Sequence, residues 1–488
     1  MQSKYKYQWY QQIYENIPKI VAEATKEAAK LGLDKLRSEI GLYSGSSACP
    51  GSLPYYVLDA IVEANKQRIF PLRKIEDELR EVIKDVYGDE YDAAVANTAE
   101  AGLRACLEIL VAPPTMRKGD AYRGRLITPY GEDYEYFGAY GRPFPPKYKN
   151  INVDRSVSAG ELGVEGKSLN NLDSVYVRYV GARYEVHGIR QNPVSLLTRV
   201  DAAKTAERIR MVAERHVESL TGFSIIGYDT PGWGNGQKDR DGVPKLMKLI
   251  GQTTEDFDVP FLVDCASCLP IIGVTPQEIN ADIMLWSMDK PGRAPTSGLI
   301  VGKEEAMVPV RKGLGYGGQR YGEVSSHGKA LFSLSDPGRD AIVGLTAFLK
   351  ILRDDPDKVK RPIDKLHEII VEEFKTLQPS RFRDKLLITK SYSMGGSEMN
   401  YAKTWDDGGF GIPIFNLEDL YANTNPISLA QEAMGVAPST IYSGNMFLTP
   451  GLGTLDENAE LNEEYARIGI KALVRSVEIV CKYAGLTD

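Results

Sequence analysis

Two charged residues that follow apolar segments are the features of this chain best suited to chemistry. Asp264 ends the run Pro260-Phe261-Leu262-Val263-Asp264, and Lys290 follows the apolar segment 281–287. A lysine amine can form a Schiff base with a carbonyl group, and a carboxylate can pair with a protonated ring nitrogen. The same two residues could also form an ordinary exposed pair at the ends of two strands.

Four further features favour chemistry over an exposed pair. Ser287 stands three residues before the lysine, a glycine-rich turn follows it, a turn of small residues occurs near residue 98, and these features come in a fixed order. Together they predict a site for pyridoxal 5'-phosphate (PLP), whose protonated ring acts as an electron sink.

The turn near residue 98 predicts a phosphate site. The segment 91–103 indicates a short strand, a tight turn of small residues and a helix that runs to about Val111. The free N–H groups of a helix N-terminus bind phosphate well. An ordinary strand-to-helix turn would have the same sequence pattern.

Composition limits the classes of protein and partner. The chain has 488 residues, a net charge of −7 and a pI of about 5.5. This length can bury a large core in two or three domains, and the acidic balance gives no bulk attraction to nucleic acid or to an anionic membrane. The segment 1–6 does not resemble a signal peptide, and no apolar run is long enough to span a bilayer, so we expect a cytoplasmic protein.

Cysteine and histidine usage argues against a metal centre. Five cysteines in this length do not make a disulfide framework, and there are only four histidines. Cys265 and Cys268 have C-x-x-C spacing, but no second pair completes a zinc site. We therefore expect packing thiols and no metal.

Three regions are expected along the chain. Residues 1–70 form an N-terminal helical segment and loop, 71–340 a PLP-binding large domain, and 341–488 a smaller α+β C-terminal domain. Apolar periodicity predicts helices at 8–38, 55–68, 71–87 and 338–352, and a Gly/Ser/Pro loop at 41–54.

Strand and helix signals alternate from about residue 173 to 304. The expected order is a strand at 175–180, a helix at 201–219, a strand at 222–228, a glycine-rich turn at 230–236, a helix at 242–250 and the strand that ends at Asp264. This alternation predicts an α/β fold with a mostly parallel sheet flanked by helices. Ligands of such sheets bind beyond the carboxyl ends of the strands, where Asp264 and Lys290 are expected.

Two loops could approach this site. Residues 112–172 are loop-rich and crowded with aromatic residues, which could cover a flat ring or form a lid or subunit contact. The stretch Gly313–Gly318 lacks the frame of a dinucleotide fingerprint, so it is interpreted as a flexible loop near the site or one that reaches a neighbouring subunit.

The lysine segment resembles that of fold-type I PLP enzymes, the aspartate aminotransferase superfamily. It is most similar to the group of bacterial selenocysteine synthase and D-glucosaminate-6-phosphate ammonia-lyase. The similar segments are Ser287–Gly302, Val263–Pro270, Ala96–Leu103 and Gly338–Leu345. The resemblance covers roughly 41–111 and 173–352, and it implies a large domain with a seven-stranded type of sheet.

Carried over to this sequence, the resemblance implies a role for each matching residue. Lys290 would form the Schiff base, Asp264 would pair with the pyridine nitrogen, and Ala266 would lie against a ring face. Asn97, Thr98 and Ala99 would bind the phosphate, with Ser287 also near it.

The sequence departs from the family pattern at three positions. Glu100 replaces an alanine, and a carboxylate beside a phosphate is repulsive. No histidine occurs near Ser168 or Leu169, where the family has a stacking one; an aromatic residue of 134–137 could replace it. Met288 replaces a small residue. These departures suggest a different substrate.

The expected function is that of a PLP-dependent lyase that eliminates from an amino acid or amino sugar acid. An aminotransferase, or a carbon–carbon or carbon–sulfur lyase, is the main alternative, and tRNA-dependent selenium or sulfur transfer has lower weight. A catalytically silent relative would not need Lys290, Asp264 and Ser287 together. Candidate arginines for a substrate carboxylate are Arg293, Arg320, Arg339 and Arg383, and a homodimer or higher homo-oligomer is expected.

Overall fold

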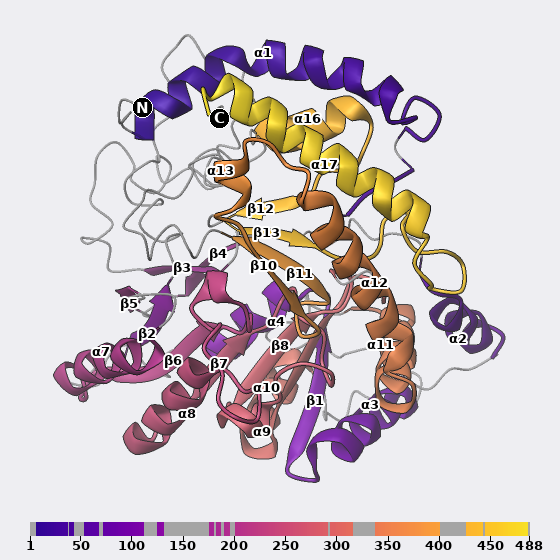
Figure 1. Ribbon diagram of the computed structural model, residues 1–488. Helices are drawn as coiled ribbons and strands as arrows, with labels where there is room; N and C mark the ends of the chain where they lie inside the picture. The colour runs from indigo at the N-terminus through magenta and orange to yellow at the C-terminus, as the bar shows by residue number, and fades with distance from the viewer. Residues whose placement is uncertain are drawn as a thin grey trace.

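The computed structural model describes most of the chain. The described residues are 6–37, 39–42, 53–67, 72–111, 124–130, 175–179, 182–186, 190–195, 201–290, 293–315, 337–400, 426–442 and 445–486. They form a seven-stranded sheet, a four-stranded sheet and a two-stranded sheet, with helices packed around the two larger ones (Figure 1).

The seven-stranded sheet is mostly parallel. Its order is β1 (Tyr91–Ala96), β9 (Gly298–Lys303), β8 (Ile283–Ser287), β7 (Phe261–Asp264), β6 (Leu220–Ile226), β2 (Arg125–Tyr130) and β5 (Arg190–Ser195). Strand β9 runs antiparallel to both neighbours, and all other pairs are parallel. Strands β1, β6, β7 and β8 are buried along their whole length, as expected of a sheet covered on both faces. The predicted α/β fold with a mostly parallel sheet is confirmed.

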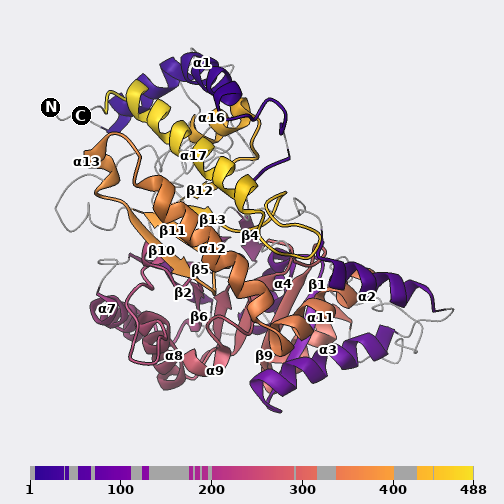
Figure 2. The ribbon, with the colours of Figure 1, turned by 45° about the vertical axis from the view of Figure 1, so that its right-hand side comes forward.

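Helices surround this sheet. They are α3 (Leu72–Tyr87), α4 (Ala99–Cys106), α7 (Ala202–Arg215), α8 (Lys245–Phe257), α9 (Pro276–Ile279) and α10 (Glu304–Leu314). Helix α11 (Arg339–Asp354) packs between α3 and α2 (Tyr55–Asn65) at one side of the sheet (Figure 2). Apolar residues of these helices and of the sheet strands form one continuous core.

The four-stranded antiparallel sheet belongs to a second core. Its order is β10 (Leu387–Ser391), β11 (Gly396–Asn400), β13 (Asn445–Leu448) and β12 (Thr440–Tyr442). Helices α12 (Asp357–Phe374), α13 (Ser380–Arg383), α16 (Pro426–Met434) and α17 (Glu463–Tyr483) contribute to the same core.

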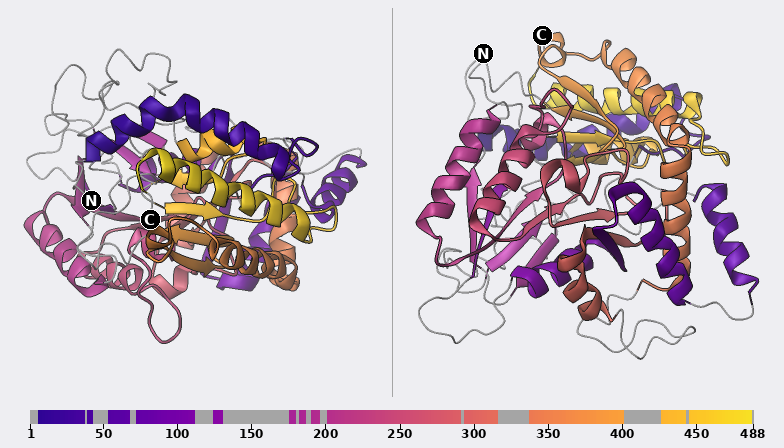
Figure 3. Two further views of the ribbon diagram at one scale, coloured as in Figure 1. Left: turned by 45° about the horizontal axis from the view of Figure 1, so that its top comes forward. Right: turned by 90° about the horizontal axis from the view of Figure 1, so that it is seen from below.

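Helix α1 (Lys6–Lys30) joins this second core although it comes from the other end of the chain. It packs on α16 and α17, and Ile13 and Ile20 are fully buried there (Figure 3). The Gln12 side-chain amide donates to the Tyr483 carbonyl oxygen at 2.9 Å.

Three loop and strand predictions need correction or comment. Strand β2 lies within the segment 112–172 that was predicted to be loop-rich; its apolar run is short and contains Pro129, which hides a strand signal. The predicted strand at 175–180 forms β3 (Val175–Tyr179), which pairs with β4 (Ala182–Val186) in a separate hairpin. The aromatic residues at 134–148 lie outside the described residues.

The glycine-rich stretch 313–318 begins inside a helix. Gly313 and Leu314 are the last residues of α10, and Gly315 ends it in a left-handed conformation with φ 96°. Residues 316–318 lie outside the described part of the chain. Among the helices that are described, none combines the length and the apolar composition that crossing a bilayer requires.

Candidate functional site

Two predicted site residues lie at the same edge of the large sheet. Asp264 is the last residue of β7 and pairs in register with Leu285 of the parallel strand β8. Lys290 stands three residues after Ser287, where β8 ends. The two side chains interact electrostatically, because the lysine charge lowers the pKa of the Asp264 carboxyl. The structure therefore brings together the acid and the amine that the sequence pointed to.

The Asp264 carboxyl is buried and only partly satisfied. It is 5% exposed, and its Oδ1 accepts a hydrogen bond from the Ala266 amide at 3.0 Å. Burial raises the pKa of Asp264 to about 6, against the opposing effects of Lys290 and the Ala266 amide. A buried carboxylate of this kind is stabilised by a cationic partner, since the charged form is otherwise poorly solvated.

The turn after β1 forms the N-terminus of a helix, as predicted. Thr98 caps α4, and its Oγ1 accepts from the Ala101 amide at 3.0 Å. The Gly102 amide donates to the Thr98 carbonyl oxygen. No hydrogen bond within the described residues uses the Ala99 and Glu100 amides, which are the first two of the helix and are free to bind an anion. Asn97, half-buried, links this turn to β1.

Strand β9 packs directly against this turn. Its Gly298 pairs with Ala96 of β1 on one side and with Ser287 of β8 on the other. The turn after β1 and the lysine segment after β8 therefore lie on either side of Gly298. A Cβ atom on Gly298 would lie 2.3 Å from the Thr98 carbonyl carbon and 2.4 Å from the Ala99 amide nitrogen. Glycine is required here because the turn rests directly on the strand.

Ser287 is the last residue of β8. It is fully buried, and its hydroxyl donates to Asp289 Oδ1 at 2.8 Å. Asp289, itself 3% exposed, is a buried acid next to Lys290 that the sequence analysis did not single out.

Glu100 belongs to the same electrostatic group. Burial raises the pKa of its carboxyl, although the side chain keeps contact with solvent, and the charge of Lys290 opposes the rise. Its negative charge in turn raises the pKa of Asp264. The two acids share one lysine, and the repulsion between their negative charges disfavours ionisation of both at once.

The C-x-x-C cysteines follow Asp264 inside the protein. Cys265 and Cys268 are each 1% exposed, and both sulfur atoms lie near the Gly227 carbonyl oxygen, at 3.9 and 3.7 Å. Cys268 Sγ also lies 3.7 Å from Met394 Sδ. In the described portion of the chain no cluster of three histidine, cysteine or acidic side chains suits a metal ion.

A buried glutamate from the second sheet reaches the loop after β6, and sequence reasoning missed it. Glu398 of β11 is fully buried; it accepts from the Thr230 hydroxyl and, at 2.8 Å, from the Gly232 amide. Its neighbour Asn400 donates to the same carboxylate at 2.5 Å. No local pattern could have revealed this contact, because the partners are 168 residues apart along the chain.

Aromatic rings also pack where the loop after β6 meets the second sheet. Tyr228 packs edge-on against Trp233 with ring centroids 5.2 Å apart, and Trp233 stacks on Phe447 of β13 at 6.4 Å. The Tyr228 hydroxyl also bonds to Ser267 at 3.0 Å, which connects the loops after β6 and β7.

The candidate arginines differ sharply in burial. Arg339 and Arg383 pair with their exposed neighbours Asp340 and Asp384. Arg293 is only 2% exposed. Arg320 lies outside the described residues. Of the three described candidates, only Arg293 lies inside the protein and close in sequence to Lys290.

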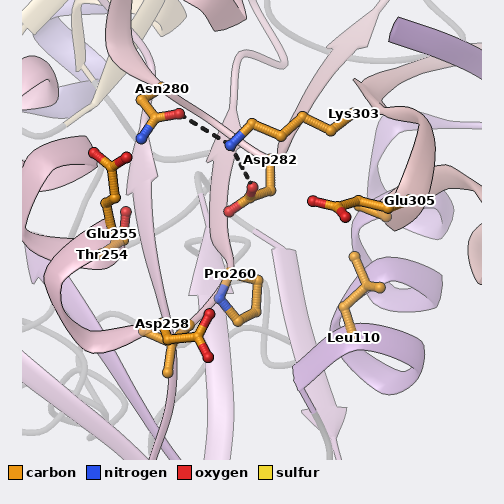
Figure 4. Close-up of a pocket in the computed structure, with 11 residues that line it drawn as sticks. Leu110, Thr254, Glu255, Asp258, Pro260, Asn280, Asp282, Lys303 and Glu305 are labelled. Carbon is orange, nitrogen blue, oxygen red and sulfur yellow. Dashed lines mark hydrogen bonds and ion pairs between the residues drawn. The ribbon is translucent and has the colours of Figure 1, made fainter. Parts of the chain in front are cut away.

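A cavity of about 520 Å³ opens at the opposite edge of the sheet (Figure 4). Three of its polar side chains take part in hydrogen bonds within the protein. Lys303 donates to Asn280 at 2.9 Å and to Asp282 at 2.8 Å, and Asp282 also accepts from the Phe261 amide at 2.7 Å. The cavity is therefore separate from Asp264 and Lys290.

Comparisons with known proteins return structures but no families. No protein-family model and no curated protein matches the chain. A pyridoxamine–pyruvate aminotransferase from Mesorhizobium loti is similar with a TM-score of 0.49 and 14% identity, over 90% of this chain and 92% of that chain. An S-selective transaminase from Bacillus megaterium has a TM-score of 0.49 and 13% identity, over 87% and 86%. A ureidoglycine–glyoxylate aminotransferase from Bacillus subtilis has 0.47 and 12%, over 89% and 93%.

Proposed function

We propose that the chain is a PLP-dependent enzyme. The observation that carries the proposal is the meeting of Asp264, Lys290 and the N-terminus of α4 at one edge of the large sheet. The resemblance of the lysine segment to fold-type I PLP enzymes supports it independently.

The residues present fit the cofactor. The Thr98 hydroxyl and the unused Ala99 and Glu100 amides would hold its phosphate, with Asn97 beside them. Asp264 would pair with the ring nitrogen, and Ala266, 6% exposed, would lie against the ring. Lys290 would bind the cofactor covalently through Nζ.

The chemistry follows from these positions. When bound, PLP supplies a protonated ring that accepts the electrons of a bond broken at the substrate Cα. The Asp264 carboxylate would keep the ring nitrogen protonated. The Lys290 amine would serve as the base that moves a proton at the substrate Cα.

Within this class we propose a lyase that eliminates from an amino acid or amino sugar acid. An aminotransferase, or a carbon–carbon or carbon–sulfur lyase, is the alternative, because Lys290 and Asp264 serve all of these reactions. Selenium or sulfur transfer on tRNA has lower weight because the chain is acidic. We further propose a cytoplasmic homodimer, and a PLP-binding domain bounded by residues 71 and 340.

The test is the absorbance spectrum of the purified protein before and after borohydride, followed by peptide mapping. We expect a yellow absorption band that disappears on reduction and leaves a pyridoxyl group on Lys290. Absence of the band after PLP is added would reject the proposal and favour a catalytically silent relative. A panel of amino acids and phosphorylated amino sugar acids, with release of ammonia, pyruvate or keto acid measured, then separates lyase from aminotransferase.

A further inference from the structure

Arg293 is a charged residue inside the protein. It is 2% exposed, and Ala294 beside it is fully buried. The connection from β8 to β9 packs on helices α11 and α2 here: a Cβ atom on Gly344 would lie 2.6 Å from Pro295 Cδ and 3.1 Å from Val57 Cγ1. The guanidinium is therefore held by packing and cannot reach solvent freely.

No acidic side chain of the described residues pairs with this arginine. Across the part of the chain that the structure describes, Arg293 forms no ion pair, and its Nη1 has no hydrogen-bond partner. Glu460 acts on the pKa of Arg293 only through its charge, and its carboxylate binds Arg361 at 3.0 Å. Arg293 is thus a buried cation without a counter-ion in the described structure.

Tyr56 of α2 lies beside Arg293 and also has a buried polar group. The Tyr56 hydroxyl is buried and has no hydrogen-bond partner among the described residues. Burial raises the pKa of Tyr56 and lowers the pKa of Arg293, and the charge and hydrogen bonding between the two side chains oppose both shifts. The phenol oxygen can accept from one guanidinium N–H, but this neutral acceptor leaves the charge of Arg293 and the Tyr56 O–H without an anionic partner among the described residues.

Such an arrangement is costly unless a ligand completes it. Removing an unpaired charge from water is strongly unfavourable, and buried charges in proteins are paired. The planar guanidinium matches the two oxygens of a carboxylate or phosphate, and an adjacent hydroxyl adds a third donor. We propose that Arg293 and Tyr56 form a buried binding site for the oxyanion group, carboxylate or phosphate, of a ligand.

The oxyanion could belong to a substrate or to the cofactor. The site itself does not depend on PLP chemistry; only the identity of its natural ligand rests on the proposed function. Lys290 stands three residues before Arg293 in the sequence.

The experiment uses inorganic phosphate and acetate as probes on the purified full chain without PLP. Their affinities are measured by calorimetry, and the melting temperature is measured with and without each probe. The variants are Arg293→Met and Tyr56→Phe. The matched control is Arg80→Met, because Arg80 is paired with buried Asp92 at 2.6 Å.

We expect Arg293→Met to raise the melting temperature without probe, since it removes an unpaired buried charge, whereas Arg80→Met lowers it. We expect at least one probe to bind the unmodified chain saturably, and Arg293→Met to weaken that binding about tenfold or more. Tyr56→Phe should weaken it less. Selective loss of phosphate binding would indicate a phosphorylated ligand, and selective loss of acetate binding a substrate carboxylate.

Three results would overturn the site. They are no saturable binding of either probe, unchanged affinities in both variants, or destabilisation of Arg293→Met as large as that of Arg80→Met. Tyr56→Phe keeps the binding test valid should Arg293→Met not fold. Since neither probe contains PLP, failure here is separate from failure of the Lys290 labelling experiment.

Discussion

The Cβ position of Gly298 lies 2.3 Å from the carbonyl carbon of Thr98, so strand β9 and the turn before α4 are in direct contact. Contacts this short leave room for hydrogen only. The position of the proposed phosphate site therefore depends on a residue that contributes no functional group.

Gly298→Ala should displace this turn. We expect a loss of about 1–3 kcal/mol in the free energy of unfolding, typical of overpacking, and weaker binding of PLP. Urea unfolding and PLP titration measure the two effects. Gly222→Ala in β6 is the control: its nearest neighbour would be the Pro260 carbonyl oxygen at 3.2 Å, away from the turn. Equal PLP affinity in Gly298→Ala and the unmodified chain would contradict the proposed phosphate site.

Asp264 should make the stability of the PLP-free protein depend on pH. Burial raises its pKa from 3.8 to about 6, so the folded state holds the proton more tightly than the unfolded state. The contribution of Asp264 to the free energy of unfolding should then fall by about 3 kcal/mol as pH rises from about 4 to about 6. Asp264→Asn should remove this fall, make the PLP-free protein more stable at neutral pH, and abolish turnover.

Urea unfolding between pH 4 and 8 measures the difference between the two proteins. Asp282→Asn is the control, because Asp282 is bonded to Lys303 and to the Phe261 amide and its loss should destabilise. Parallel stability curves for Asp264→Asn and the unmodified chain would exclude this role of Asp264.

Lys290→Ala should lose covalent cofactor binding and turnover while remaining folded. The reason is that Lys290 supplies the amine, whereas the strands on either side of it hold the structure. Circular dichroism reports folding, and borohydride labelling reports attachment. Lys303→Ala, at the opposite edge of the same sheet, should still be labelled. Labelling of another lysine in Lys290→Ala, with activity retained, would reject the assignment.

Glu100→Gln should change the pH dependence of PLP binding. The pKa of Glu100 is raised by burial, against the effect of Lys290, so its carboxyl ionises at a higher pH than the ordinary 4.5. Above that pKa the carboxylate repels the phosphate, and affinity falls. The glutamine variant should bind more tightly than the unmodified chain at high pH and equally at low pH. An affinity ratio that stays constant with pH would show that Glu100 does not face the phosphate.

The predicted parts of the site are those that local sequence encodes. Asp264, Lys290 and Thr98 each lie at the end of an apolar run or within three residues of it, and a strand end or a helix cap is a property of a few adjacent residues. Contacts between distant segments could not be predicted in this way. Glu398 reaches Thr230 only because the second sheet docks on the first, and the burial of Arg293 depends on helices from both sides of it in the sequence.

The packing of α1 on α17 has a consequence for synthesis of the chain. The Gln12 amide and the Tyr483 carbonyl are 471 residues apart in sequence. At a synthesis rate of about 5–20 residues per second, α1 must wait about 25 to 95 s before its partner helix emerges. During that interval Ile13 and Ile20 have no core to enter, so the nascent chain exposes an amphipathic helix that a chaperone could bind. Completion of the second core is therefore a late event in the life of each molecule, after the large sheet has had time to form.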